Sequence, residues 1–373
     1  MPTYKFSDIA TNVTEKRMPV PEDRHLYIAP NNLETETLTV PEFGYKVDLN
    51  GTKLVMHKGD MLFGRREPQL KHAAIAPHDG LFSAHGMIFH PKENVICKEF
   101  FPFFISSDYF FDEAIRIAVG SLSPTVNWKD LKDVEFTLPN LDEQKRLAKI
   151  LWAIVNSKKA YKEIISASDE LVKSQFIEMF YGKGYPVKTI GEVIDKNIVR
   201  VAKVFGKTDL IQYLDISSID NVSREVIGLT PYTLSNAPSR AQYVLKQGDI
   251  LFSTVRPNLQ NIAINPYNDD NIIGSTGFCV LRCLKVRTGY MWGVVNSTLF
   301  TTDMVKKASG ANYPAVTDKV VHAYKIPIPP EEAQIAYEQF IQQSDKSKFE
   351  AKKAIEELNS LQKKILLNVF GEQ

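Results

Sequence analysis

An internal repeat of about 190 residues restricts the possible folds of this chain more than any other feature. Residues 58–63 (KGDMLF) return as residues 247–252 (QGDILF), 189 positions later. Farther along, the pattern Gly-x3-Pro-x-Val at residues 120–126 recurs at residues 310–316, displaced by 190. This period is far longer than the roughly 20–50 residues of solenoid repeats. The chain is therefore expected to be a duplicated unit, each copy being one domain and one further element.

The two parts of each copy differ in their patterns. Residues 1–140 (module one) and 185–330 (module two) mix short β-branched or aromatic runs with Gly, Pro, Asn and Asp, which is typical of strands and loops. Residues 141–180 contain neither Gly nor Pro, and their apolar residues follow nearly heptad spacing, which recurs over residues 331–370. Each segment predicts one helix of ~37 residues, ~55 Å long.

Two such helices are expected to pair. A single apolar stripe of that length needs a partner, and the module between the helices lets the second return antiparallel to the first. The alternative is that each helix packs only on its own module. The predicted fold class is α/β, with mixed α+β modules separated by an antiparallel pair of coiled-coil-like helices and related by a pseudo-two-fold axis. The predicted boundaries are 1–140, 141–184, 185–330 and 331–373.

Composition and targeting signals narrow the class of protein. The three cysteines, Cys97, Cys279 and Cys283, are too few for a disulfide framework and are expected to be free thiols. The N-terminus has no apolar signal segment, and no apolar run approaches the ~18 residues of a membrane span. These observations predict a cytoplasmic protein.

Motifs of catalysis and metal binding match only in part. Residues 265–267 (NPY) lack the second proline of the loop that holds a flipped base in DNA methyltransferases, and a turn after a strand explains them. Residues 206–208 (GKT) lack the glycine that a phosphate-binding loop requires. Four histidines of module one have irregular spacing that fits no metal site: His72, His78, His85 and His90. The sequence therefore predicts no catalytic residue and no metal ligand.

The duplicated motifs resemble those of one known family. They are the two GD-[MI]-L-F segments, the two Gly-x3-Pro-x-Val segments, the run LPNLDEQ ending at Gln144, and its partner IPPEEAQ ending at Gln334. In this order, and followed by helices that end at Phe180 and Phe370, they resemble the specificity (S) subunit of Type I restriction-modification systems. The likeness covers nearly the whole chain. Ala333, where the first copy has Glu143, departs slightly from the pattern.

The resemblance implies a non-catalytic DNA-binding subunit. It implies two target recognition domains, each reading one half of a split sequence in double-stranded DNA. It also implies that methyltransferase (M) subunits, usually two, dock around the helices, and that a restriction (R) subunit can join. S-adenosylmethionine, ATP and Mg²⁺ would then belong to the partner subunits, and this chain would hold no cofactor.

Two polar segments in each module are candidates for DNA contact, and ordinary surface loops are the alternative for both. One segment follows each GD-x-L-F strand, where Arg suits guanine and Asn or Gln suits adenine. The other follows Gly120 and Gly310, where small donors suit phosphates or base edges. The candidates of the first segment are Arg65, Arg66, Gln69, Lys71, His72, Arg256, Asn258, Gln260 and Asn261. Those of the second segment are Ser121, Ser123, Thr125, Asn127, Asn312, Tyr313 and Thr317.

The charge distribution leaves DNA binding open. The net charge of +1 combines −4 in residues 1–140, +1 in 141–180, +6 in 181–330 and −2 in 331–373. Since phosphate contacts require basic residues, the M subunits are expected to supply much of the affinity. Two other functions remain open: a freestanding two-headed DNA-binding regulator, and a protein-interaction scaffold without DNA binding.

Overall fold

The computed structural model describes residues 1–45, 49–310 and 312–371. It divides into two compact units, of which unit one contains residues 1–164 and 350–373 and unit two contains residues 165–349. Each unit combines one module with a part of each long helix. The sequence-based boundaries divide the chain differently, and they stay a prediction.

Module one is built on two four-stranded sheets, with strand orders β2-β9-β6-β7 and β3-β5-β8-β4, and on the short pair β1-β10. Strand β6 lies between β9 and β7, and all four of its residues are buried. The strands are β1 (Thr3–Lys5), β2 (Ala10–Val13), β3 (Lys16–Arg17), β4 (Tyr27–Ile28), β5 (Lys53–Met56), β6 (Met61–Gly64), β7 (Ala73–Ile75), β8 (Gly80–Phe82), β9 (Gly86–Pro91) and β10 (Glu135–Thr137).

Module two repeats this plan with orders β12-β21-β18-β19 and β16-β13-β20-β17, and the pairs β11-β22 and β14-β15. Its strands are β11 (Val187–Thr189), β12 (Ile194–Asp195), β13 (Leu210–Leu214), β14 (Ile219–Asp220), β15 (Glu225–Val226), β16 (Thr230–Thr233), β17 (Ala241–Val244), β18 (Ile250–Ser253), β19 (Ile262–Ile264), β20 (Ile272–Ser275), β21 (Phe278–Cys283) and β22 (Lys325–Pro327).

The second sheets share a parallel pair and differ in their fourth strand. Strands β4 and β8 pair in parallel in module one, as β13 and β20 do at the equivalent place in module two. The fourth strand of module one, β3, joins the sheet beside β5. In module two the fourth strand, β16, joins at the opposite edge, beside β13. The duplicated core of the sheet is thus three strands. Module two adds β16 at one edge and keeps a single bridge, between Arg200 and Tyr243 of β17, at the edge where module one has β3.

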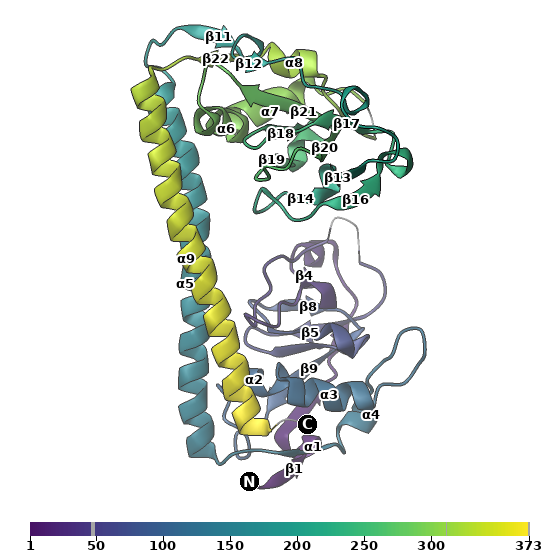
Figure 1. The fold of residues 1–373 in the computed structure, drawn as a ribbon. Helices are drawn as coiled ribbons and strands as arrows, with labels where there is room; N and C mark the ends of the chain where they lie inside the picture. Colours follow the sequence, from purple (N-terminus) through teal and green to yellow (C-terminus); the bar gives the residue numbers. More distant parts are fainter. Residues whose placement is uncertain (46–48, 311, 372–373) are drawn as a thin grey trace. The chain divides into compact units, whose positions relative to one another are not determined.

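Short helices complete the modules, and two long helices follow them (Figure 1). The helices of unit one are α1 (Phe6–Ile9), α2 (Phe101–Ile105), α3 (Asp108–Arg116) and α4 (Trp128–Leu131), and those of unit two are α6 (Thr288–Asn296), α7 (Thr298–Lys307) and α8 (Asp318–His322). The long helices, α5 (Leu141–Phe180) and α9 (Glu331–Phe370), each contribute to both units.

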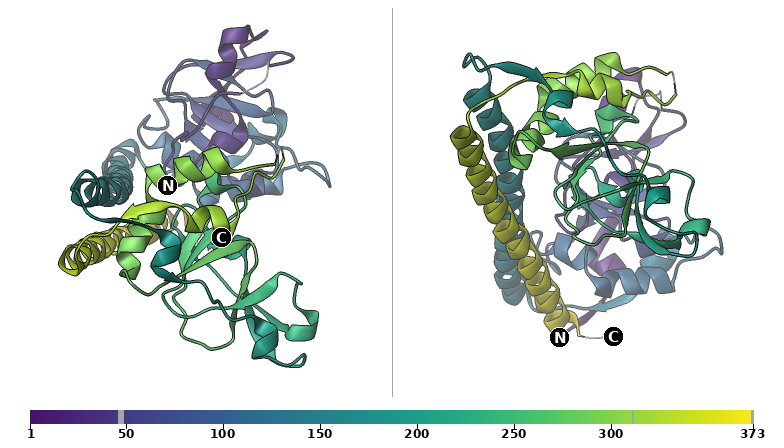
Figure 2. Two further views of the ribbon diagram at one scale, coloured as in Figure 1. Left: turned by 90° about the horizontal axis from the view of Figure 1, so that it is seen from above. Right: turned by 45° about the horizontal axis from the view of Figure 1, so that its top comes forward.

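Helices α5 and α9 pack together in antiparallel orientation, which confirms the predicted pair (Figure 1, Figure 2). In unit one the Lys158 ammonium donates to Asn359 Oδ1 at 3.0 Å and to Gln362 Oε1 at 2.8 Å. In unit two the Lys348 ammonium donates to Asp169 Oδ1 at 2.8 Å. Lys348 lies 190 residues after Lys158, and Asn359 lies 190 residues after Asp169. The pseudo-two-fold repeat is therefore present in the contacts of the pair.

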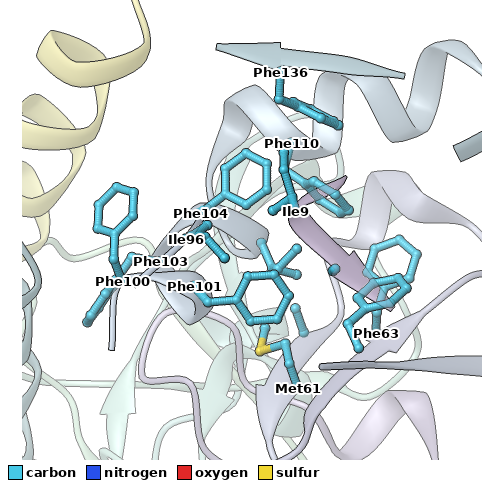
Figure 3. Packing of buried hydrophobic residues seen from close by; sticks show 14 of the residues in the cluster. Ile9, Met61, Phe63, Ile96, Phe100, Phe101, Phe103, Phe104, Phe110 and Phe136 are labelled. Carbon is cyan, nitrogen blue, oxygen red and sulfur yellow. The ribbon is translucent and has the colours of Figure 1, made fainter. Parts of the chain in front are cut away.

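A cluster of phenylalanines forms the main core of module one (Figure 3). The run FFPFF at residues 100–104 supplies four buried rings from α2 and the residue before it. Phe110 of α3 contacts Phe136 of β10 with their ring centroids 5.5 Å apart. Leu147 and Leu151 of α5 are buried in the same cluster. The first turns of the long helix are therefore fixed by the module.

Module two has an equivalent core with fewer phenylalanines. Phe252 of β18 and Phe300 of α7 pack edge to face, with centroids 5.1 Å apart. Tyr290 of α6 and Tyr337 of α9 are buried there, and Phe180 at the end of α5 contacts both rings. In this unit the end of α5 and the start of α9 are the parts fixed by the module.

A buried glutamine near the start of each long helix ties that helix to its module. The Gln144 side chain accepts a hydrogen bond from the Cys97 amide at 2.7 Å. It also donates to the carbonyl of the proline five residues earlier at 2.8 Å. Gln334 accepts from the Arg287 amide at 2.9 Å and donates to its own preceding proline at 2.9 Å. The repeated glutamine of the sequence motif thus satisfies buried backbone groups.

The motifs without a predicted function have structural roles. The Asn265 side chain is buried and bonds the backbone of Lys246 and Tyr267 in the turn after β19, as the turn interpretation predicts. Residues 206–208 lie in a turn where the Gly206 amide donates to Asp209. The cysteines are free, two of them buried and Cys283 half-buried. His90 lies on strand β9 rather than in a loop and bonds Asp60.

Candidate nucleic-acid interface

Each of strands β6 and β18 runs into a turn of the same construction. In module one the turn contains the short 3-10 helix η3 (Pro68–Leu70), and in module two it contains η8 (Pro257–Leu259). Residues 65–72 and 254–261 are named the left-handed turns below. The last residue of each strand bonds the end of the turn. The Gly64 amide donates to the His72 carbonyl at 2.8 Å, and the Ser253 amide donates to the Asn261 carbonyl at 3.0 Å.

Each left-handed turn contains non-glycine residues in a backbone conformation that such residues rarely adopt. In module one Glu67 and Lys71 flank the 3-10 helix, each with φ of 51°. In module two Arg256 and Gln260 take the equivalent places with φ of 50° and 52°. Positive φ is uncommon for residues other than glycine, and it persists where the surrounding structure enforces it. Both modules therefore hold two non-glycine residues in strained conformations at the same two places.

The glycine loops, residues 119–127 and 309–317, pack against the left-handed turns. Residue 311 of the second loop lies outside the described residues. Gly120 and Gly310 have φ of 116° and 109°, which side chains disfavour. The Glu67 amide donates to the Pro124 carbonyl at 2.7 Å, and the Arg256 amide donates to the equivalent proline carbonyl at 2.7 Å. The two candidate segments of each module, far apart in sequence, therefore form one surface.

In module one, three of the predicted residues differ in how far they reach the surface. Arg66 and Gln69 are exposed on the turn. Arg65 is only partly exposed, and it lines a cavity of about 90 Å³ together with Asn12 and Trp128. Within the described structure the Arg65 Nε has no hydrogen-bond partner. Arg66 and Gln69 are thus placed to reach a ligand directly, whereas Arg65 points inward.

The other two residues of that turn lie on its inner side. The Lys71 ammonium forms an ion pair with Asp108 at the start of α3, and the Lys71 carbonyl accepts a hydrogen bond from Thr35. His72 follows, half-buried, and both side chains line a cavity of about 1030 Å³ within unit one. Lys71 therefore anchors the turn, which is a positioning role that the sequence pattern does not reveal.

In module two the equivalent anchor is an amide. Gln260 Nε2 donates to Thr301 Oγ1 of α7 at 2.8 Å, and Gln260 Oε1 accepts from the Arg224 guanidinium at 2.6 Å. Burial lowers the pKa of Arg224 from its ordinary value, against the opposing charges of Asp169 and Glu170. Both ends of the Gln260 amide are thus occupied inside the protein.

An arginine and a tyrosine join the two segments of module two. The Arg256 guanidinium lies over the Tyr313 ring, 4.6 Å from its centroid. Arg256 also donates to the Asn312 carbonyl at 3.3 Å. Tyr313 is 69% exposed, so the stacked pair faces solvent. Asn258 is exposed at the tip of the same turn, where module one has Gln69.

The remaining predicted residues surround these groups at the surface or just below it. Exposed residues are Ser121, Ser123, Asn312 and Thr317, and partly exposed residues are Thr125, Asn127 and Asn261. Thr125 Oγ1 donates to the Ser123 carbonyl at 3.1 Å, which uses this hydroxyl to shape the loop.

Two arginines of the turn in module one, Arg65 and Arg66, affect the pKa of nearby His85. Burial is the main reason that the pKa of His85 is lowered, and the charges of Arg66 and Arg65 lower it further. His85 is therefore mostly neutral near pH 7. Both arginines thus lie close enough to His85 for their charges to influence it.

One residue of the surface was missed by the sequence reasoning. Glu67 lies between Arg66 and Pro68 in the left-handed turn, and its backbone matches that of Arg256. Basic, amide and hydroxyl side chains are the usual DNA contacts, so an acidic residue is not indicated by its residue type. Aligning the repeat with its displacement of 189 places Glu67 opposite Arg256 and would have found it.

Comparison with known proteins decides the family. The Type I restriction modification DNA specificity domain matches the chain twice, over residues 30–167 and 182–360. The chain belongs to this family. It is similar to specificity subunits of Type I restriction-modification systems. The resemblance predicted from the repeated motifs is thereby confirmed.

A curated relative agrees with this assignment. The chain is 25% identical over 272 residues to the Type I restriction enzyme MjaVIII specificity subunit of Methanocaldococcus jannaschii, covering 66% of this chain and 64% of that one. The match thus spans less than two thirds of that relative's length.

The likeness to the solved structures concerns the fold. One comes from work on complex assembly and conformational transition of the Type I restriction-modification system, with a TM-score of 0.59, 18% identity and coverage of 99% and 97% of the two chains. The other is the S subunit from M. genitalium, with a TM-score of 0.55, 13% identity and coverage of 100% and 96%.

The described residues contain neither a membrane-spanning helix nor a metal-binding cluster. Within residues 1–45, 49–310 and 312–371, no helix combines the length and the apolar character needed to cross a bilayer. Over the same residues, no group of three or more His, Cys, Asp or Glu side chains is arranged to hold a metal ion.

Proposed function

We propose that this chain acts as a specificity subunit and reads a split sequence in double-stranded DNA, one half with each module. The observation that carries the proposal is the duplicated surface made by a left-handed turn and a glycine loop. Its backbone hydrogen bonds are the same in both modules, whereas its exposed side chains differ. A duplicated frame with different side chains suits two readers of different sequences.

The proposed contacts fall into two groups. Side chains exposed on the turns and loops are proposed to contact bases or phosphates: Arg66, Gln69, Ser121, Ser123, Arg256, Asn258, Asn312, Tyr313 and Thr317. The less exposed candidates are proposed to position this surface or to contact the DNA at its margin: Arg65, Lys71, His72, Thr125, Asn127, Gln260 and Asn261. Arg in the first group suits guanine, and Gln or Asn suits adenine.

The partners are proposed from the family. M subunits, two for each S subunit, would dock around α5 and α9 and bring S-adenosylmethionine for adenine methylation. An R subunit would bring ATP and Mg²⁺ for translocation and cleavage. The complex would act in the cytoplasm. Because module one carries a net charge of −4, the M subunits would supply much of the phosphate affinity.

The experiment that tests the proposal exchanges one module. Residues 185–330 are replaced by the matching module of another specificity subunit, and the chain is expressed with the M subunit of its own system. Sequencing of methylated positions in the host DNA is expected to show one half of the target changed and the other half retained. The unaltered chain with the same M subunit is the control.

Three outcomes would count against the proposal. If both halves of the methylated sequence stayed unchanged, the modules would not read DNA independently. If the chain and its M subunit gave no sequence-specific methylation, a scaffold without DNA binding would fit better. Tight and specific binding by the isolated chain, without effect on methylation, would favour a freestanding regulator.

A further inference from the structure

Glu67 and Arg256 occupy the same backbone position in the two modules. Each precedes the proline that opens a 3-10 helix, and their φ and ψ are 51° and 58° for Glu67 and 50° and 61° for Arg256. Each amide donates to the proline carbonyl of the adjoining glycine loop at 2.7 Å. The two side chains therefore leave equivalent backbones in equivalent directions.

The chemistry of the two side chains is opposite. Glu67 offers only acceptors when ionised, and Arg256 offers only donors. Within the part of the chain that the structure describes, the Glu67 carboxylate has no hydrogen-bond or ion-pair partner. The Arg256 guanidinium lies over the Tyr313 ring. Glu67 is partly exposed and Arg256 is exposed, and one Arg256 N–H donates to the Asn312 carbonyl at 3.3 Å while the other donors of the guanidinium stay available. The strained backbone beneath each side chain is fixed.

We propose that these two residues select opposite bases at equivalent places of the two half-sites. Arg256 donates to O6 and N7 of a guanine in the half read by module two. Glu67 accepts from N4 of a cytosine in the half read by module one. This inference rests on the proposed function, and it assigns one base of each half-site to one residue.

Phosphate contact is a poor alternative for both residues. A carboxylate at a surface that faces DNA is repelled by phosphates, so a base amino group is the partner that suits Glu67. Adenine also carries an amino group, but its N7 acceptor lies beside that group and repels a carboxylate. Stacking on Tyr313 holds the Arg256 guanidinium in one plane, and that arrangement favours two parallel hydrogen bonds over a diffuse charge contact.

The test measures base preference position by position. The full chain is reconstituted with its M subunit and allowed to select from a randomised duplex library, which is then sequenced. The module exchange described above assigns each half of the target to its module. Wild-type selection is expected to contain a cytosine in the half of module one and a guanine in the half of module two.

Substitutions then alter one position at a time. Glu67→Gln is expected to change the cytosine to adenine, because an amide pairs with adenine N6 and N7, and Arg256→Glu is expected to change the guanine to cytosine. Each change in preference is expected to be roughly 10- to 100-fold at that position, with all other positions unchanged. Arg256→Lys is expected to keep guanine with weaker selection.

Matched controls separate base reading from folding and from charge. Arg200 also stacks on a tyrosine, with its guanidinium 4.6 Å from the Tyr243 ring, so Arg200→Glu reverses the same charge in the same module. Glu135→Gln on β10 is the control for module one. Both controls are expected to leave the selected sequence unchanged, and circular dichroism checks that all variants are folded.

Three outcomes would overturn the inference. The wild-type target could lack the expected cytosine or guanine. Arg256→Glu could lower affinity equally for all sequences, which is the behaviour of a phosphate contact. The variants could select the wild-type sequence. In each case a split target whose halves follow the exchanged modules would still support the proposed function. The proposed function itself fails if the wild-type complex selects no split target or if the module exchange leaves both halves unchanged.

Discussion

In module one the left-handed turn is held by an ion pair between Lys71 and Asp108, and in module two by the amide of Gln260 between Thr301 and Arg224. The backbone of the two turns is nevertheless the same, down to φ values that agree within a few degrees. The difference shows that the frame depends on backbone hydrogen bonds and on the glycine loop. The side chains on that frame are free to vary, which a reader of different sequences requires.

The cores beneath the two frames differ more than the frames do. Phe110 and Phe300 are equivalent residues of α3 and α7, and both are fully buried. Phe110 contacts six aromatic rings, with centroids 5.3–6.4 Å away. Phe300 contacts two, at 5.1 Å and 5.0 Å, among the described residues. Removing each ring therefore measures how much the additional aromatic contacts contribute to the stability of module one.

The largest expected effect comes from Phe110→Ala. Loss of a buried phenylalanine costs about 3–5 kcal/mol, and each lost aromatic pair adds to the cost of burial alone. Phe110→Ala is expected to lower the free energy of opening of module one by about 4–5 kcal/mol, and Phe300→Ala that of module two by about 3 kcal/mol. Hydrogen exchange measured on peptides of each module reports the two values separately. Equal losses would mean that the aromatic cluster adds nothing beyond buried area.

The second expected effect concerns the lysines of the helix pair. Lys158 is 2% exposed and donates to three oxygen atoms, those of Asn359, Gln362 and the Glu36 carbonyl. Lys158→Met leaves buried acceptors without donors and is expected to cost about 1–3 kcal/mol. Lys348→Met removes a more exposed pairing and is expected to cost about 0–1 kcal/mol. Thermal unfolding of both variants at neutral pH measures the difference.

The pH dependence of the two lysines has opposite sign. Burial lowers the pKa of Lys158 below its ordinary 10.5, so the unfolded chain binds more protons and the contribution of Lys158 to stability rises as the pH approaches 10.5. For Lys348, burial is outweighed by hydrogen bonds to Asp169 and Asp345, and its pKa is raised. Its contribution is complete below pH 10.5 and is lost as the pH rises through the folded value.

The variants Lys158→Met and Lys348→Met isolate the pH dependence of stability that each lysine contributes. The stability advantage of the wild type over Lys158→Met is expected to grow towards pH 10.5. The advantage over Lys348→Met is expected to shrink above that pH. Unfolding temperatures measured in a pH series give both differences, and slopes of the same sign would contradict the opposite environments of the two lysines.

The last comparison concerns a helix cap that the two modules share. Ser107 and Ser297 cap α3 and α7, and each hydroxyl accepts from the amide three residues later at 3.2 Å. Ser107→Ala and Ser297→Ala are each expected to cost about 1 kcal/mol, the usual value of such a cap. Hydrogen exchange of the two helices measures both. Clearly unequal losses of stability would show that the two caps are not equivalent.

Much of the fold could be predicted from local patterns. The long helices run from residues 141 and 331 to residues 180 and 370, as the heptad spacing and the flanking glycines indicate. Strands β6 and β18 coincide with the repeated GD-x-L-F segments. These elements were predictable because their periodicity is written in consecutive residues. The different edges at which β3 and β16 join their sheets were not, since edge pairing depends on distant partners.

The candidate site was predictable only in part. The sequence marks Arg66, Gln69 and Asn258 as polar residues near a repeated motif, and the structure exposes them. It cannot show that Lys71 and Gln260 bond helices about 40 residues away. Nor can it show that a glycine loop supplies the carbonyl for Glu67. Those contacts arise from chain segments brought together by the fold.

From the amino-acid sequence one can predict that this chain is a duplicated unit with two long helices that pair, because the repeat, the heptad spacing and the motif order are visible in consecutive residues. Tertiary structure alone decided which polar side chains face outward and which anchor the turns. It also placed Glu67 and Arg256 on equivalent backbones with opposite chemistry. The physical reason is that exposure, strain and hydrogen-bond partners depend on how distant segments pack, and local sequence does not specify this packing.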